Sequence, residues 1–188
     1  MKNLLILLAS ATYLSSIWAA LFYFKIEDSS GSKAKKLISI IGLIAIFLSL
    51  GILVKLPSIS LLLDCISAAL YLCSLIIFWC SYLASKNYSL NFAFSDTTPE
   101  KLIVQGPYKW VRHPFYSSYI LSWLGVFVYA PNLISLIIIL LMTSIYFVAA
   151  AKEEKNILIS RLGYIYQEYQ YKTGRFLPKL HMFNLAIK

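Results

Sequence analysis

The stretch FYSSYILSWLGVFVYAPNLISLIIILLMTSIYFVAAA, residues 115–151, decides the fold of this chain. It holds two apolar runs, at 115–130 and 133–151, with only Pro131 and Asn132 between them. A helix needs about 20 residues to cross a hydrocarbon layer of about 30 Å, and both runs reach or approach that length. We therefore predict two membrane-spanning helices joined by a tight hairpin, so that the entry of the first helix and the exit of the second lie at the same membrane face.

Three further apolar runs precede the hairpin, at residues 4–24, 37–54 and 65–83. Of the 188 residues, 60% are hydrophobic and only 13% are charged, which is typical of a chain that spends most of its length in lipid. A closed barrel would show segments of about ten residues with alternating polarity, whereas these runs are continuously apolar. The predicted fold is all-α: a polytopic integral membrane protein with about five transmembrane helices and a cytoplasmic C-terminal helical segment.

The connections between the runs are short, so we expect a single structural domain. Within it, residues 1–84 form a three-helix transmembrane scaffold, and residues 85–188 form a catalytic half made of a cytoplasmic loop, the hairpin 114–151 and the C-terminal cytoplasmic segment. A cleaved secretory signal is the alternative for the first run, but its apolar stretch extends to Phe24 and is too long for a signal core. The three cysteines fall in the third run, where disulfides and a metal site are not expected.

The basic residues predict the orientation of the chain, because short cytoplasmic loops accumulate Lys and Arg. If the C-terminus is cytoplasmic, fifteen of the 17 basic residues lie on the cytoplasmic side, and only Lys2 and Lys55 lie outside. We therefore predict that the N-terminus is outside and that the polar segments around the hairpin face the cytoplasm. The net charge of +9 also raises the possibility of nucleic-acid binding, but the charges flank the apolar runs, so contact with anionic membrane lipids explains them and no nucleic-acid partner is expected.

The first polar segment is GPYKWVRHPFY, residues 106–116, which leads directly into the fourth run. Pro114 suits the first turn of a helix, so His113 is expected at or near its cap. The unpaired N–H groups of that helix end and the permanent charge of Arg112 form a site for a carboxylate or phosphate. In isolation, Arg112 is equally well explained as an anchor at the membrane face, and His113 as a simple cap.

The second polar segment follows the fifth run and begins with Lys-Glu-Glu-Lys at residues 152–155. It continues as a helix that is interrupted at Gly163. Neighbouring carboxylates point in different directions on a helix, so at most one of Glu153 and Glu154 is expected to face inward. Both are also compatible with a solvated helix end. A cationic helix start opposite an acidic helix exit, however, binds a zwitterion.

Aromatic residues accompany both polar segments. The turn at Gly106 is expected to aim Tyr108 and Trp110 at the same place. Four tyrosines between Gly163 and Lys172 suit the membrane interface, where the ring is buried and the hydroxyl stays hydrated. They are explained either as an aromatic belt or as part of a substrate cage.

These residues resemble the isoprenylcysteine carboxyl methyltransferase and phospholipid methyltransferase superfamily. The resemblance covers roughly residues 87–178 and rests on the sequence RHPFY at 112–116 together with these flanking residues: Leu102, Ile103, Gly106, Pro107, Tyr108, Glu153, Glu154, Leu162, Gly163, Tyr166, Tyr169 and Arg175. Members of that family are integral membrane enzymes that move a methyl group from S-adenosylmethionine to a lipid-like acceptor. The resemblance implies a cofactor pocket formed by Leu102, Ile103, Gly106, Tyr108, His113, Pro114, Phe115, Tyr116 and Glu154, and catalytic roles for Arg112, Glu154 and Arg175.

This implied chemistry agrees with the charges of the two segments. The methionine end of the cofactor carries a carboxylate, which the helix start with His113 can hold, and an ammonium. Glu154 can hold either that ammonium or a ribose hydroxyl of the cofactor. The sulfonium is already activated, so the protein has to position donor and acceptor and exclude water. The glycine-rich turn that binds this cofactor in soluble enzymes is missing, since the chain contains no Gly-x-Gly.

The acceptor stays open at the level of sequence. Isoprenylcysteine-methylating relatives have an Arg four residues before the binding Glu, where this chain has Ala150, so a prenylated carboxylate lacks its expected partner unless Lys152 or Arg175 replaces it. A phospholipid amine must lose a proton, and the sequence identifies no base for that step. A sterol and a small thiol also stay open as acceptors. The alternative function is a non-enzymatic membrane protein that binds or transports lipid, and a further alternative is an inactive relative kept as an assembly partner.

Overall fold

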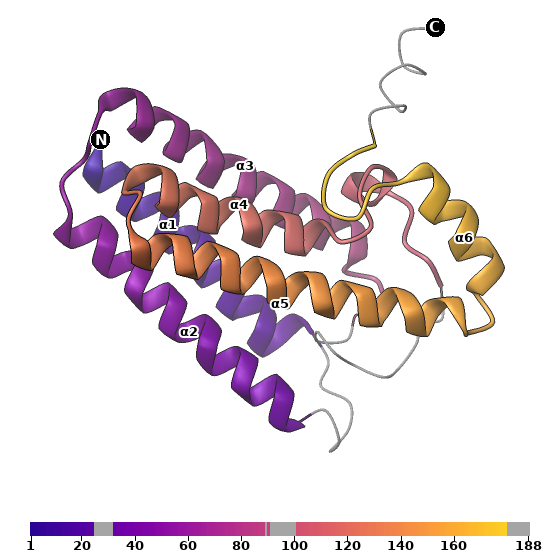
Figure 1. The fold of residues 1–188 in the computed structure, drawn as a ribbon. Helices are drawn as coiled ribbons and strands as arrows, with labels where there is room; N and C mark the ends of the chain where they lie inside the picture. The colour runs from indigo at the N-terminus through magenta and orange to yellow at the C-terminus, as the bar shows by residue number, and fades with distance from the viewer. Residues whose placement is uncertain (25–31, 89, 91–100, 180–188) are drawn as a thin grey trace, which may run out of the picture.

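The structure is a computed structural model and describes residues 1–24, 32–88, 90 and 101–179, with side chains from residue 36 onward in the second of these ranges. Five long helices run side by side as a bundle, and a sixth lies across one end (Figure 1). Three parts of the predicted cytoplasmic side lie outside the described residues: Lys25, Lys188 and positions 91–100 of the loop.

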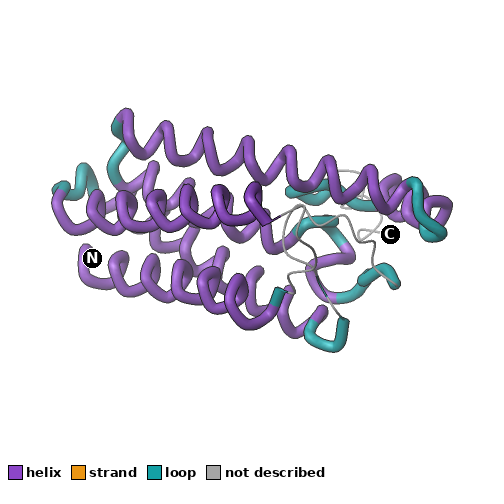
Figure 2. Tube along the Cα trace, turned by 90° about the horizontal axis from the view of Figure 1, so that it is seen from below, coloured by secondary structure: helices purple, strands orange, loops and turns teal. Residues whose placement is uncertain are grey.

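The elements follow the apolar runs closely. They are α1 (Lys2–Trp18) with a π-helical extension η1 (Ala19–Tyr23), α2 (Ser32–Lys55), α3 (Leu61–Ser85), the 3₁₀ turn η2 (Gly106–Lys109), α4 (Pro114–Tyr129), α5 (Leu133–Leu158) and α6 (Gly163–Lys172). Helix and loop are the only conformations drawn for the described chain in Figure 2, which agrees with the all-α prediction.

Local sequence explains where the helices begin. Ser60 caps α3 by accepting a hydrogen bond from the Leu63 N–H at 3.3 Å. Asn132 caps α5 as part of a capping box with Ser135, immediately after the Pro131 turn. Pro114 occupies the first turn of α4, as predicted. The hairpin between α4 and α5 is therefore determined by the two residues that separate the apolar runs.

The helix α4 lies at the centre of the bundle. Two serines of α3 donate hydrogen bonds to its backbone carbonyls, Ser67 to Gly125 and Ser74 to Ser118, both at 2.8 Å. Small and hydroxyl-bearing residues allow such close approach between helices in a membrane. The tight packing positions the beginning of α4, where the predicted site lies.

Within the described residues, four helices are long and apolar enough to cross a membrane: Lys2–Tyr23, Lys36–Lys55, Leu61–Ser85 and Leu133–Leu158. The protein is therefore a multi-pass membrane protein. At 16 residues, or about 24 Å, α4 is shorter than the usual span. The predicted count of five transmembrane helices stays a prediction.

The two ends of the bundle hold different segments of the chain. At one end, Lys2 Nζ donates to the Val54 carbonyl at 2.7 Å, and the Tyr129 hydroxyl donates to the Leu56 carbonyl at 3.0 Å. The N-terminus and the α4–α5 turn lie at this end in Figure 1. The start of α4, the end of α5 and all of α6 lie at the opposite end, so the two polar segments of the sequence are spatial neighbours.

Candidate functional site

The chain after α6 lies along the segment that enters α4. The Arg112 N–H donates to the Gly174 carbonyl at 2.8 Å, the Gly174 N–H donates to the Trp110 carbonyl at 3.0 Å, and the His113 N–H donates to the Arg175 carbonyl at 3.1 Å. A side chain adds to this pairing, because the Ser117 hydroxyl donates to the Phe176 carbonyl at 2.7 Å. These bonds fix the tail against the cap of α4.

The turn before this segment requires a glycine. Gly106 has a φ of +56°, a left-handed conformation that residues with a side chain rarely adopt. A Cβ at this position would lie 2.9 Å from the Cβ of Ala84 in α3. The turn therefore holds the loop close to α3, which is also contacted by Gln105 through a 2.9 Å hydrogen bond to the Ala84 carbonyl.

Glu154 is at the centre of the site, and its side chain is only 5% exposed. Its carboxylate accepts hydrogen bonds from four side chains: Arg112 Nε at 2.9 Å, His113 Nε2 at 3.1 Å, Gln170 Nε2 at 3.2 Å, and Arg175 through Nε at 3.1 Å and Nη2 at 2.7 Å. These partners come from the α4 entry, from α6 and from the tail. A single buried carboxylate thus joins three segments that are far apart in the sequence.

Arg112 and Arg175 differ in their surroundings. Arg112 is 9% exposed, and its Nη1 also donates to the Gln170 and Thr173 carbonyls, which end α6. Arg175 is 28% exposed, and its guanidinium lies 4.8 Å from the centroid of the Phe147 ring. The hydrogen bond to Glu154 raises the pKa of Arg175 further above its ordinary value. Arg175 is therefore the more accessible of the two guanidinium groups.

His113 lies between two carboxylates. Its Nε2 is 3.1 Å from Glu154 Oε1 and its Nδ1 is 3.4 Å from Glu153 Oε2. Burial by itself lowers the pKa of His113, but hydrogen bonds and charge interactions with Glu153 and Glu154 outweigh burial and raise that pKa above its ordinary value. Because both ring nitrogens face an acceptor, the ring is suited to be a doubly protonated imidazolium.

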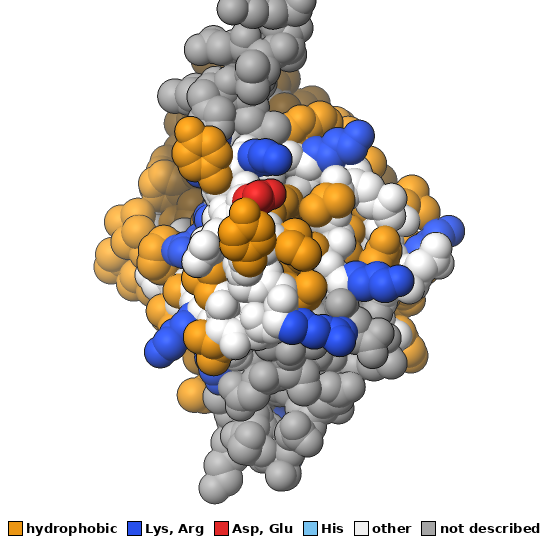
Figure 3. Space-filling view, turned by 90° about the vertical axis from the view of Figure 1, so that its right-hand side faces the viewer, with side chains coloured by type: hydrophobic (Ala, Val, Ile, Leu, Met, Phe, Trp, Pro, Cys, Tyr) orange, Lys and Arg blue, Asp and Glu red, His pale blue; other side chains and the backbone are white. Residues whose placement is uncertain are grey.

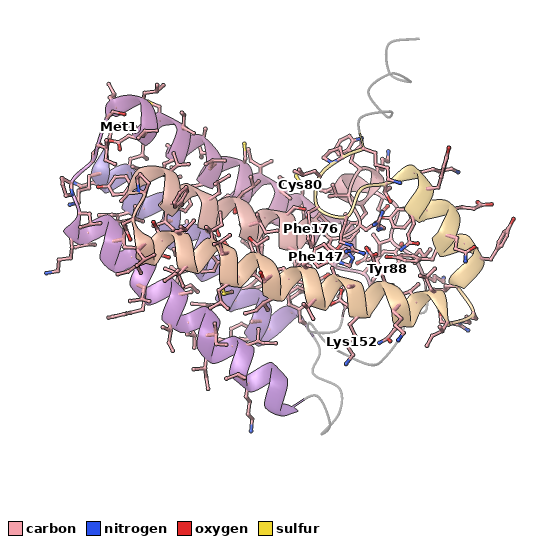
Figure 4. The ribbon with its side chains drawn as sticks, in the orientation of Figure 1. Met1, Cys80, Tyr88, Phe147, Lys152 and Phe176 are labelled. Atoms are coloured by element: carbon pink, nitrogen blue, oxygen red, sulfur yellow. The ribbon has the colours of Figure 1, made fainter. Side chains whose placement is uncertain are left out.

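Aromatic rings continue from this cluster into the bundle. The His113 ring stacks on Tyr116 with centroids 5.5 Å apart, and Tyr116 stacks on Tyr146 of α5 at 5.3 Å. The edge of Phe176 faces both His113 and Tyr116. In Figure 4, Phe147 and Phe176 lie together beside the end of α5 that carries Lys152. On the side of the apolar helices, the charged cluster therefore borders an aromatic wall, formed by the rings of Tyr116, Tyr146, Phe147 and Phe176.

The structure brings together part of the predicted cofactor pocket and the three predicted catalytic residues. Arg112, His113, Tyr116, Glu154 and Arg175 form one cluster, as described above. The ring of Phe115 instead packs against Phe24 and Phe78, 5.2 and 5.3 Å away, on the side of α1 and α3.

The remaining members of the predicted pocket differ in burial and contacts. The Tyr108 carbonyl accepts a 2.7 Å hydrogen bond from the Tyr169 hydroxyl, which ties the 3₁₀ turn to α6. Leu102 is half-buried, Ile103 and Pro114 are buried, and Gly106 is exposed. The roles of all these residues in cofactor binding stay predictions.

One local prediction was confirmed and one was wrong. Glu154 is buried and Glu153 is 26% exposed, as expected if at most one of them faces inward, although both contact His113. Tyr108 and Trp110 do not point to one place, since Tyr108 is buried whereas Trp110 is 53% exposed. Residues two apart in a tight turn project to different sides.

Sequence reasoning missed several residues of the site. Gln170 and Thr173 complete the buried face of α6 that begins with Tyr166, and this i, i+4, i+7 spacing was a usable signal. Phe147 and Tyr146 carried no such signal, because they lie within an uninterrupted apolar run. Their part in the site depends on the helix face that α5 turns toward α4.

The chain belongs to the phospholipid methyltransferase family, whose model matches residues 63–164, more than half of the chain. A methanethiol S-methyltransferase from Pseudomonas sp. (strain GM41(2012)) is 35% identical over 91 residues, which make up 46% of this chain. The chain spans about a third of the length of that curated relative, since the match covers 33% of it. No solved structure matches the chain.

Proposed function

We propose that this protein is a membrane methyltransferase that transfers the methyl group of S-adenosylmethionine to an amphiphilic or lipid-like acceptor. The observation that carries the proposal is the charge cluster around Glu154, which unites the α4 entry, α6 and the tail in a chain of the phospholipid methyltransferase family. Buried charges are costly in a membrane protein, so a cluster of them is by default a hypothesis of a functional site.

The donor set of the cluster fits this cofactor. Its amino-acid end carries one negative and one positive charge, and the cluster offers cations at Arg112, His113 and Arg175 and a carboxylate at Glu154. The bound cofactor supplies a methyl group that its sulfonium has already activated. In this proposal Arg175, the most accessible cation of the cluster, contacts the cofactor carboxylate, and the neighbouring rings exclude water from the reacting atoms.

The position of Glu154 suggests how it contributes. Its two oxygens are occupied by the Arg, His and Gln side chains, so in this arrangement it orients the cations that hold the cofactor. The direct contact with the cofactor ammonium that the resemblance implies requires one of these donors to move aside.

Three acceptor classes are compatible with the proposal: the carboxylate of a prenylated cysteine, a phospholipid amine, and a thiol. The thiol is included because one relative of this chain is a methanethiol S-methyltransferase. Ala150 is fully buried and supplies no charge for an acceptor carboxylate, which favours the other two classes.

We further propose that the site faces the cytoplasm and that the N-terminus lies outside. The end of the molecule formed by α6 carries several separate Lys and Arg patches with a small acidic patch among apolar side chains (Figure 3). Basic residues of this kind mark the cytoplasmic side of membrane proteins. Labelling of single cysteines at positions 133 and 172 in intact cells tests the orientation, since only the first should react with an impermeant maleimide.

Binding and transfer are tested separately. The demethylated product, S-adenosylhomocysteine, should bind to the detergent-solubilised protein. His113→Ala and Glu154→Ala should abolish binding with the fold retained, while the exposed α6 variant Glu168→Gln still binds. Unchanged binding in both variants would show that the assigned residues are wrong. Incubation of membranes with methyl-labelled cofactor should label a lipid or thiol fraction. A lipid-binding or transport protein would label neither.

A further inference from the structure

We propose that Glu153 accepts the proton of a thiol acceptor during methyl transfer. This inference rests on the proposed function and assigns a separate role to each of the two adjacent carboxylates. Glu154 positions the cations of the site, whereas Glu153 contacts the reacting group of the acceptor.

Glu154 has no capacity left for a substrate proton. A carboxylate offers about four lone-pair directions. Oε1 of Glu154 accepts from Arg112, His113 and Arg175, and Oε2 accepts from Gln170 and Arg175. Three of the four donor side chains are the Arg112 and Arg175 guanidinium groups and the His113 imidazole, which stabilise the ionised carboxylate. Glu154 is therefore a poor base.

Glu153 has capacity left. Its Oε1 accepts a hydrogen bond from the Tyr116 hydroxyl at 2.6 Å, and its Oε2 forms an ion pair with His113 Nδ1 at 3.4 Å, so each oxygen has one partner and a further lone-pair direction left. The Glu153 side chain is 26% exposed, compared with 5% for Glu154. Oε2 can therefore accept a proton from a bound molecule, and the exposed fraction lets the proton pass on to water.

The surroundings suit this step. Tyr116, which holds Oε1, is stacked between His113 and Tyr146, so the carboxylate borders an aromatic wall on the membrane side. A thiol carried on an apolar group can approach along that wall. His113 contacts both carboxylates and so fixes the distance between the cation cluster and the proton acceptor.

The balanced reaction needs no further reagent. The thiol sulfur donates an electron pair to the methyl carbon of the cofactor, and a sulfur–carbon bond forms. The bond between that carbon and the cofactor sulfonium breaks, and its electron pair stays on the cofactor sulfur. The thiol proton moves to Glu153 Oε2, which gives a neutral thioether, neutral S-adenosylhomocysteine and a protonated carboxyl group.

The test compares two thiols that differ in acidity. Octanethiol is protonated near neutral pH and needs a base, whereas thiophenol is largely ionised at slightly alkaline pH and does not. With Glu153→Gln, we expect kcat for octanethiol to fall about 100-fold, in the range for a lost general base, and kcat for thiophenol to fall much less. Glu153→Asp should recover part of the octanethiol rate. Glu168→Gln on α6 is the matched control and should leave both rates unchanged.

Binding of S-adenosylhomocysteine is the readout that does not depend on turnover. We expect Glu153→Gln to retain it, because Glu154 and the arginines remain in place. Equal losses for both thiols, or a loss of product binding in Glu153→Gln, would overturn the role of Glu153. If Glu153→Gln does not fold, an octanethiol rate in Glu153→Asp equal to that of wild type overturns the proposal, and a reduced rate for octanethiol alone supports it.

The wild-type protein separates this inference from the proposed function. Wild-type protein that binds S-adenosylhomocysteine and methylates a lipid extract but neither thiol overturns the inference and leaves the proposed function intact. Wild-type protein that neither binds the product nor transfers methyl groups overturns the proposed function itself.

Discussion

Replacement of Glu154 by glutamine should strongly destabilise the protein, because it removes the charge that compensates a buried group of cations. Arg112 and Glu154 are 9% and 5% exposed, so water cannot replace the lost interaction. Removing one partner of a buried ion pair costs about 3–5 kcal/mol. For a chain of this size, about 1 kcal/mol corresponds to about 2–4 °C in Tm, so the expected decrease is on the order of 10 °C.

The assay is thermal unfolding of the purified protein in detergent, followed by the fluorescence of a thiol-reactive dye or by light scattering. Glu168→Gln removes the same charge from the exposed face of α6 and should change the free energy of unfolding by less than about 0.5 kcal/mol. A double-mutant cycle with Arg175→Gln should show a coupling of about 0.5–3 kcal/mol with Glu154. A Tm of Glu154→Gln within about 1 °C of wild type, with the same fold, would refute the view that this carboxylate holds the site together.

The remaining predictions concern pH and three other positions. The folded protein raises the pKa of His113, so the stability that this residue contributes is fully present below its unfolded pKa of about 6.5. That contribution is lost as the pH rises through the folded pKa. Tm should therefore decline over this pH range in wild type but not in His113→Gln. Arg175→Lys removes the two-pronged contact with Glu154 and the contact with Phe147, and S-adenosylhomocysteine should bind more weakly to it than to wild type in a calorimetric titration. Gly106→Ala forces a side chain into a left-handed residue and should cost about 1–2 kcal/mol by thermal unfolding, whereas Gly51→Ala, whose added Cβ meets no atom within 4 Å, should not destabilise.

Much of the fold could be predicted because membrane-length apolar runs admit few structures. In lipid, the backbone must satisfy its own hydrogen bonds, so a long apolar run becomes a helix with little help from its neighbours. The start of α4 at Pro114 and the interruption at Gly163 could also be predicted, because proline suits the first turn of a helix and glycine weakens a helix interior. The apolar run at 115–130 matches α4, Pro114–Tyr129, to within one residue at each end.

The site was predicted only in outline. Arg112, His113 and Glu154 could be singled out, because ionisable residues beside apolar runs are conspicuous and the hairpin implied that they are neighbours. The pairing of charges within the cluster could not be derived, since it depends on the rotation of α5 about its axis and on the path of the tail. Glu153 and Gln170 are members of the cluster for that reason alone.

The sequence by itself determined that this protein is a helical membrane protein with its polar residues gathered at one end of a helical hairpin, because hydropathy and helix length are local properties. Only the tertiary structure decided which donor meets which carboxylate, because residues 112, 154 and 175 come within hydrogen-bond distance solely through the packing of α4, α5, α6 and the tail. It thereby distinguished a saturated Glu154 from a partly open Glu153, two adjacent residues of the same type whose chemistry differs because a helix turns them toward different neighbours.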